Sequence, residues 1–261
     1  MATVIAITNQ KGGVGKTTAC IEIATSMHTL GKKVLLIDLD QSCNLSKYVS
    51  AETGKAGIYD VLKAEVPISE AIQTLENYSI LPATPELSKA EKTFTEITDI
   101  YLLQDAIDIL NENYDFDYIL VDTGPSRSIL LNMAYIAAEY FIVPTVSDDG
   151  SLSAITELYK DMKKLSKIKA GEKKNSEVLA FILNQDCNYT VHRLARETLQ
   201  KRAAALDPHP IIASIHNSDA DAIGSKILQT DMLSYNKKSK PGKDFYDLTV
   251  AILDRLEKKH A

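Results

Sequence analysis

The chain has 261 residues, of which 45% are hydrophobic and 25% are charged, and its formal net charge at pH 7 is −6. This composition excludes an intrinsically disordered chain and allows a substantial core within one α/β domain. No apolar run approaches the roughly 18 residues that a membrane-spanning helix requires, and the first residues lack the pattern of a secretory signal peptide. We therefore expect a cytoplasmic protein that forms one domain over residues 1–261.

The cysteines and histidines offer no metal site or disulfide framework. Cys20, Cys43 and Cys187 are far apart and form no C-x-x-C pair, which argues against a zinc ribbon or an iron–sulfur cluster. We expect reduced thiols with packing roles. His192 and His216 have no partners at the spacing of a metal site or a catalytic triad, so we expect them on the surface or in loops.

Short apolar runs along the chain alternate with stretches of helical periodicity. The apolar runs predict strands at residues 3–8, 33–38, 78–82, 118–122, 140–144, 178–184 and 211–213. The helical stretches cover residues 16–30, 58–71 (as short helices around Pro67), 100–113, 128–139, 152–167, 191–205 and 245–256. This alternation predicts an α/β fold with a mostly parallel, twisted sheet and helices on both faces.

Three distinctive features each follow a predicted strand. A glycine-rich loop follows the first strand, Asp38 ends the second, and Asp122 ends the fourth. Ligands of open parallel sheets bind at the carboxyl ends of the strands. We therefore expect these three features to meet at one edge of the sheet.

The glycine-rich loop joins the first predicted strand to the first predicted helix. Its residues are Lys11, Gly12, Gly13, Val14, Gly15, Lys16, Thr17 and Thr18. Glycines let backbone N–H groups surround phosphate oxygens, and the helix N-terminus adds partial positive charge. Lys16 would neutralise the β- and γ-phosphates of ATP, and Thr17 would offer its hydroxyl to Mg²⁺. The strict G-x-x-x-x-G-K-[ST] pattern fails at one position, where the chain has Gln10.

The additional lysine, Lys11, gives this loop a more specific resemblance. The string from Gln10 to Thr18 resembles the deviant Walker A motif of the ParA/MinD superfamily. It is most similar to the ParA group of plasmid and chromosome partition ATPases, which commonly have N-Q-K-G-G-V-G-K-T-T after an apolar strand. The similarity continues through residues 34–40 and the Walker B strand at residues 118–122, and more weakly to the last helix. The resemblance implies a P-loop NTPase domain over the whole chain.

The resemblance also implies roles in a nucleotide-sandwich homodimer that forms on ATP binding. Lys11 of one subunit would reach the partner's phosphates, as an arginine finger does, while Lys16 would serve its own nucleotide. Asp40 would position the attacking water, Asp38 would support the Mg²⁺ shell, and Asp122 would hold Mg²⁺ through a water. The catalytic residues would thus be Lys11, Lys16 and Asp40.

The chain departs from the family pattern near the expected γ-phosphate region. After Asp40 the family usually continues P-Q-G-N, whereas residues 41–43 here are Q-S-C and only Asn44 is kept. After Asp122 the family often has two prolines, where residues 124–125 here are G-P. Loss of proline and glycine changes the allowed backbone. We expect slow hydrolysis without a stimulating partner, and a nucleotide-binding regulator with weak turnover remains an alternative.

Asn184 and the basic residues extend the resemblance into the C-terminal half. Asn184 matches a position near the adenine in relatives, and a turn residue at a strand end explains it equally well. Seven lysines occupy residues 160–174. In relatives, basic residues of the C-terminal half contact DNA without sequence preference, while a solvated surface is the alternative. The candidate zone comprises Arg193, Arg196, Lys201, Arg202 and, in a predicted polar loop, Lys237, Lys238, Lys240 and Lys243.

The implied function is a partition ATPase that hydrolyses ATP to ADP and phosphate and positions plasmid, chromosomal or mobile-element DNA. The ATP-bound dimer would be nucleoid-associated, and a ParB-like centromere-binding adaptor would trigger hydrolysis. We expect no N-terminal helix-turn-helix extension and hence no operator binding. The alternative is a MinD-like ATPase that positions proteins or binds membranes. Residues 255–261 offer no spare apolar face, so stable membrane association is not expected. The cysteine placement also disfavours a reductase-type relative with a shared iron–sulfur cluster.

Overall fold

A twisted eight-stranded sheet forms the centre of the molecule. The computed structural model describes residues 1–148, 150, 155–161, 164, 176–187 and 189–260. Within these residues the strand order is β3-β4-β2-β5-β1-β6-β7-β8. The strands are β1 (Thr3–Ile7), β2 (Val34–Leu39), β3 (Gln73–Thr74), β4 (Ser79–Leu81), β5 (Tyr118–Thr123), β6 (Tyr140–Thr145), β7 (Glu177–Asp186) and β8 (Ile211–His216). Only the β3–β4 pair is antiparallel, which confirms the predicted fold class.

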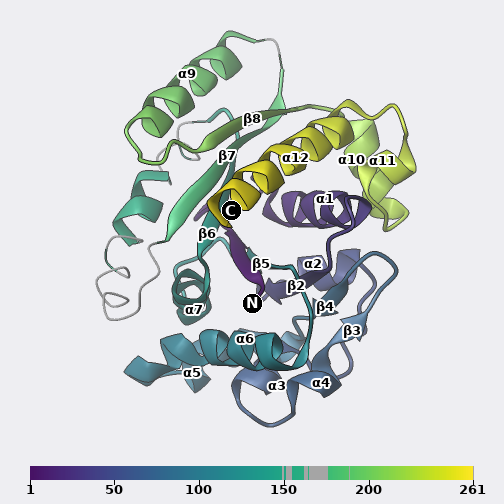
Figure 1. Ribbon diagram of the computed structural model, residues 1–261, viewed down its shortest axis with the longest axis vertical. Helices are drawn as coiled ribbons and strands as arrows, with labels where there is room; N and C mark the ends of the chain where they lie inside the picture. Colours follow the sequence, from purple (N-terminus) through teal and green to yellow (C-terminus); the bar gives the residue numbers. More distant parts are fainter. Residues whose placement is uncertain (149, 151–154, 162–163, 165–175, 188, 261) are drawn as a thin grey trace.

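Helices cover both faces of this sheet (Figure 1). The α-helices are α1 (Lys16–Thr29), α2 (Asn44–Tyr48), α3 (Ile58–Leu62), α4 (Ile68–Ala71), α5 (Ala90–Thr93), α6 (Leu102–Asn113), α7 (Ile129–Ala137), α9 (Thr190–Ala204), α10 (Asp219–Ile227), α11 (Met232–Tyr235) and α12 (Lys240–His260). There are also two short 3₁₀ helices, η1 (Pro85–Lys89) and η2 (Ile97–Tyr101), and residues 155–161 are helical.

Alternation along the strands sends side chains into two separate apolar layers. In β1, Val4 and Ala6 join the layer that α3, α6, α7 and α9 cover. Ile5 and Ile7 join the opposite layer, which α1 and α12 cover. Strand β1 lies inside the sheet and is fully buried. The loop that leads to α1 follows its carboxyl end directly. The fold thus presents the glycine-rich loop at the middle of one sheet edge.

The C-terminal part differs most from the sequence prediction. The last helix starts at Lys240 rather than near Phe245, so Lys240 and Lys243 lie on α12 and not in a loop. The Ser239 hydroxyl accepts the Gly242 N–H at 3.2 Å and thereby caps this helix, whose early proline is also compatible with a first turn. Of the lysine-rich segment 160–174, only residues 160, 161 and 164 are described, and its other lysines lie outside the described residues.

Candidate functional site

The glycine-rich loop adopts a backbone that depends on two of its glycines. Gly13 and Gly15 have φ angles of 74° and 88°, in the left-handed region that other residues rarely adopt. Gly15 occupies the N-cap position of α1, so the free N–H groups of the first helical turn face the loop. This arrangement gives the concave set of donors and the helix dipole that bind phosphate.

Lys16 lies at the start of α1 and points back into the loop. Its ammonium donates to the carbonyl oxygens of Asn9 at 3.1 Å and of Lys11 at 3.0 Å. Burial lowers the pKa of Lys16, while the nearby carboxylates Asp122 and Asp40 act in the opposite direction. The buried cation is therefore held by neutral oxygens, which phosphate oxygens could replace with a gain in charge pairing.

Asp38 and Asp122 meet at the carboxyl ends of adjacent strands, as the sequence predicted. They are register partners in β2 and β5, and both side chains are fully buried. The Thr17 hydroxyl donates to Oδ2 of Asp122 at 2.7 Å, while Oδ1 of Asp122 has no hydrogen-bond partner among the described residues. Burial, and then the neighbouring Asp38 carboxylate, raise the pKa of Asp122 well above its ordinary value. The Thr17 hydrogen bond and the Lys16 ammonium act against this rise in the pKa of Asp122 without outweighing burial.

The Asp38 carboxylate fixes the segment that follows Asp40. Its Oδ2 accepts from the backbone N–H and the hydroxyl of Ser46, at 2.9 Å and 2.7 Å, and its Oδ1 accepts from the Asp40 N–H at 3.1 Å. Burial raises the pKa of Asp38 to about 6 against these hydrogen bonds. Asp40 is partly exposed and accepts the Ser42 N–H at 3.0 Å. Asp38 thus orients Asp40 by holding the start of α2.

Cys43 occupies the position at which the family pattern has glycine. Its φ angle is 54°, so the chain keeps a left-handed turn there without a glycine. For a residue with a Cβ this conformation costs about 1–2 kcal/mol. The side chain is 3% exposed, and its packing in the apolar layer offsets part of this cost. Cys43, which stands in place of the family's glycine, therefore keeps the left-handed turn with a strained backbone.

Lys11 is engaged within its own chain. Its ammonium forms an ion pair with Asp148, and its backbone N–H donates to Oδ1 of Asn9 at 3.1 Å. The Asn9 amide in turn donates to the Pro144 carbonyl oxygen at 2.8 Å, which ties the loop to the end of β6. The Lys11 side chain remains 37% exposed. To contact a second subunit, the Lys11 ammonium would first have to leave its ion pair with Asp148.

The Asn184 side chain contacts the glycine-rich loop. Its amide donates to the Val14 carbonyl oxygen at 2.6 Å. A small pocket of about 100 Å³ opens beside it, walled by residues that the sequence did not single out: Asn217, Ser218, Asp219, Pro241 and Phe245. These come from the two residues before α10, the first residue of α10 and the start of α12. Ser218 accepts the Asp221 N–H at 3.3 Å, so an S-x-x-D capping pattern could have located α10.

The basic residues of the candidate zone form two groups on separate elements. On α9, Arg193 and Lys201 are exposed, whereas Arg196 pairs with Asp186 and Arg202 donates to the Thr156 hydroxyl at 2.8 Å. The second group is exposed around the start of α12 and comprises Lys237, Lys238, Lys240 and Lys243. Figure 1 shows α9 and the α10–α11 region on opposite sides of α12. The structure therefore does not bring the eight residues into one patch.

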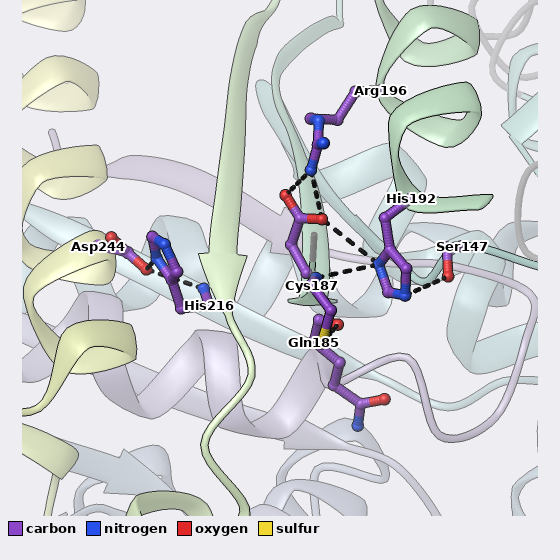
Figure 2. A network of polar contacts seen from close by, with 8 residues as sticks. Ser147, Gln185, Cys187, His192, Arg196, His216 and Asp244 are labelled. Atoms are coloured by element: carbon purple, nitrogen blue, oxygen red, sulfur yellow. Dashed lines mark hydrogen bonds and ion pairs between the residues drawn. The ribbon is translucent and has the colours of Figure 1, made fainter. Parts of the chain in front are cut away.

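His192 is neither on the surface nor in a loop, contrary to the sequence expectation, because it lies on α9 and its side chain is only 13% exposed. Its Nε2 lies 3.3 Å from the Ser147 hydroxyl, and its Nδ1 lies 3.3 Å from both the Cys187 N–H nitrogen and Oδ1 of Asp186. Figure 2 shows the imidazole turned toward Ser147 and Cys187. His216 is more exposed and pairs with Asp244 at 2.7 Å. These partners sit on other elements, so sequence spacing could not indicate them.

Protein groups alone do not complete a metal site here. Among the described residues, no group of three or more His, Cys, Asp or Glu side chains is arranged to hold a metal ion. Mg²⁺ in nucleotide sites commonly takes one or two protein oxygens together with phosphates and water, which fits Thr17 and Asp122. Among the residues that the structure describes, no helix combines the length and the apolar composition needed to span a bilayer.

Comparison with known proteins identifies the family. A family model described as an AAA domain matches residues 2–178. An uncharacterized protein of Pseudomonas putida is 36% identical over 171 residues, which are 64% of this chain and 64% of that protein. The chromosome partitioning protein ParA of Caulobacter vibrioides is 28% identical over 236 residues, 88% of this chain and 87% of ParA. The chain thus spans about 64% of the length of the Pseudomonas relative.

Solved structures share this fold. A putative plasmid partition protein of Borrelia burgdorferi bound to AMPPNP has a TM-score of 0.79 at 23% identity and covers 97% of this chain and 98% of that chain. Cobyrinic acid a,c-diamide synthase of Mycobacterium smegmatis with bound ADP and magnesium has a TM-score of 0.79 at 25% identity, covering 98% and 96%. With the family match and the partition relatives, the chain belongs to the ParA-type ATPases of the ParA/MinD superfamily.

Proposed function

We propose that this protein is a Mg²⁺-dependent ATPase that hydrolyses ATP to ADP and phosphate and uses ATP to switch its binding to DNA. The observation that carries the proposal is the meeting of Lys16, Thr17 and Asp122 under the glycine-rich loop. A buried ammonium lies beside the glycine-rich loop, together with a buried carboxyl group, one oxygen of which has no hydrogen-bond partner among the described residues. ATP with Mg²⁺ supplies the opposite charge to each of them.

The residues present fit a Mg²⁺–nucleotide. Oδ1 of Asp122 is buried and lacks a hydrogen-bond partner among the residues described, and a Cβ added at Gly12 would meet nothing within 4 Å. The site therefore offers a buried oxygen that lacks a partner, and the loop leaves open space at Gly12. Thr17 and Asp122 would hold Mg²⁺, which when bound neutralises charge on the β- and γ-phosphates. Asn184 and the pocket beside it would contact the nucleoside.

Asp40 is the residue best placed to act on the attacking water. It is the partly exposed acid of the set, while Asp38 and Asp122 are fully buried. A hydrogen bond from Ser42 and the Asp38-anchored backbone limit its motion. The strained turn at Cys43 fixes a segment that the family builds with glycine. We expect slow basal turnover, which an adaptor protein would accelerate by completing this region.

The switch would operate through dimerisation. ATP would pair two copies, and Lys11 would leave Asp148 to contact the nucleotide of the partner subunit. The dimer would bind DNA without sequence preference through its basic surfaces and would be nucleoid-associated in the cytoplasm. Residues 1–261 would act as one ATPase domain. The names of the relatives in Caulobacter vibrioides and Borrelia burgdorferi support DNA partition as the task. A ParB-like adaptor would be the partner that triggers hydrolysis.

Nucleotide binding and turnover by two variants test the proposal. Lys16→Ala should lose detectable ATP binding, because the cation is removed from the loop, while Lys92→Ala on exposed α5 should bind as the parent does. Asp40→Ala should keep ATP binding and lose at least about tenfold in turnover. Fluorescent ATP titration and phosphate release measure the two effects. Unchanged binding by Lys16→Ala would overturn the proposal, and parent-rate turnover by Asp40→Ala would remove the role given to that residue.

A further inference from the structure

A second cavity lies between α3–α4 and α6, and it shares no lining residue with the pocket beside the glycine-rich loop. Its volume is about 810 Å³, and its apolar lining includes Val61, Val66, Ile68, Leu102, Ile109 and Tyr114. Figure 1 shows α3, α4 and α6 grouped at one end of the molecule, away from α9, α10 and α11. We call this cavity the α3–α6 groove. Its size falls within the range of about 300–1,000 Å³ that is typical of ligand pockets.

Ile109 gives the groove an exposed apolar anchor point. The other large apolar residues of α6 that face the core, Leu103, Ile107 and Leu110, are at most 1% exposed. Ile109 is 49% exposed and lines the groove. A β-branched apolar side chain beside an apolar groove leaves contiguous hydrophobic surface in water. Covering it with a second apolar side chain would therefore be favourable.

The rim of the groove is acidic. Asp105 lines the groove, and Asp108 and Glu112 are exposed on the same helix. On the other wall Glu70 is exposed on α4, and Glu65 already pairs with Lys63. Helix α6 carries Asp105, Asp108 and Glu112 and no lysine or arginine. This charge repels nucleic acid and anionic lipid and attracts a cationic partner.

We propose that the α3–α6 groove docks a short amphipathic helix of a partner protein, with leucine or isoleucine side chains in the groove and lysine or arginine side chains over its rim. The groove is walled by helices, which suits the helix-in-groove mode of recognition. Strand addition is disfavoured, because the edge strand β3 has only two residues, Gln73–Thr74. The site is separate from the nucleotide loop, so docking there leaves the ATP site and the basic surfaces accessible.

A model peptide tests the chemistry of the groove. The probe is an 18-residue helical peptide, a length chosen as about five turns. It carries leucines at positions i, i+3, i+4 and i+7, lysines elsewhere, and one tryptophan. The chain has no tryptophan, so tryptophan fluorescence reports the peptide alone. We expect saturable binding to the nucleotide-free chain, weakened by NaCl. The same peptide with glutamate in place of lysine should bind at least about tenfold more weakly. No binding of the lysine peptide, or equal binding of both, overturns the proposal.

A matched pair of variants tests the location. Ile109→Lys places a charge in the groove at a half-exposed position, and Ile227→Lys makes the same change at a residue of α10 that is 72% exposed. Ile109→Lys should weaken binding of the lysine peptide at least about tenfold, and Ile227→Lys should leave it unchanged. Equal affinities for the two variants overturn the assignment to the groove.

Sedimentation of the same proteins without nucleotide decides between a partner and a second copy. A wild-type dimer that Ile109→Lys converts to monomer would mean that the groove is covered by another copy, against the proposal. A monomer in both cases agrees with an external partner. None of these measurements uses ATP or DNA. Their outcome is therefore distinct from success or failure of the proposed ATPase function.

Discussion

At the scale of single residues, the nucleotide loop depends on a close approach between Gly15 and Asn184. A Cβ at Gly15 would lie 2.5 Å from the amide nitrogen of Asn184, which itself donates to the Val14 carbonyl oxygen. The φ angle of Gly15 is also 88°. Only glycine satisfies both conditions. Both the close approach of Asn184 on β7 and the left-handed backbone at the start of α1 therefore require glycine at position 15.

Gly15→Ala should lower the free energy of unfolding by about 2 kcal/mol or more, because left-handed strain adds to the clash with Asn184. Gly12→Ala in the same loop is the matched control, since an added Cβ there meets nothing within 4 Å and no positive φ is required. Urea unfolding without nucleotide measures both variants. Equal stability of the two would show that the Gly15–Asn184 contact does not constrain the loop.

The residues of the loop could be identified from the sequence because their chemistry is local. Lys16 and Thr17 lie in one short motif, and Asp38 and Asp122 each end a recognisable apolar strand. The partners that hold these residues could not be identified in this way. Asp148 is 137 residues from Lys11, so only the folded sheet brings the two together.

At the scale of elements, a buried carboxyl group joins α1 to α11. Glu22 lies on α1, is 3% exposed, and accepts the Met232 N–H at 2.9 Å. Burial raises the pKa of Glu22 to about 8, with Asp231 acting in the same direction and the Met232 hydrogen bond against it. Glu22 is therefore protonated at neutral pH and behaves as a neutral hydrogen-bonding group. The sequence could not indicate this burial, because α11 has four residues and was not predicted.

Because of Glu22, the free energy of unfolding should decrease as the pH rises from about 4.5 to about 8. Its pKa in the folded state, about 8, exceeds the ordinary glutamate value of 4.5, so the unfolded chain releases the proton first as pH rises. The contribution of the protonated form is complete below 4.5 and is lost as pH approaches 8, by about 1.4 kcal/mol per pH unit.

Glu22→Gln should remove this slope, since an amide stays neutral and its carbonyl can still accept from Met232. The variant should be more stable than the parent at pH 8 and close to it at pH 4.5. Chemical unfolding at several pH values gives the comparison, and the exposed Glu112→Gln should keep the parental slope. A parental slope in Glu22→Gln would exclude Glu22 as its source.

At the scale of the whole molecule, the basic candidate residues and the acidic groove residues lie in different regions of the surface. The chain is acidic overall, at −6, yet two groups of exposed basic residues lie on α9 and around the start of α12. Acidic residues gather around the α3–α6 groove at the other end. Because exposed charges are screened beyond about 10 Å at 0.1 M salt, each region presents its own local field. A polyanion and a cationic helix could thus bind one molecule at separate places.

DNA binding should therefore require ATP and fall steeply with salt, because contacts to phosphates release counterions. The two basic groups need separate tests, since the structure places them on different elements. The double variants Arg193→Ala/Lys201→Ala and Lys237→Ala/Lys238→Ala each remove two exposed cations. A group that contacts phosphates should lower the slope of log K against log salt by about 2, whereas Lys92→Ala should leave it unchanged. Fluorescence anisotropy with unrelated DNA duplexes measures the slopes. If both double variants keep the parental slope, neither group binds the backbone, and retention of DNA by the nucleotide-free chain at high salt would contradict an ATP-dependent phosphate contact.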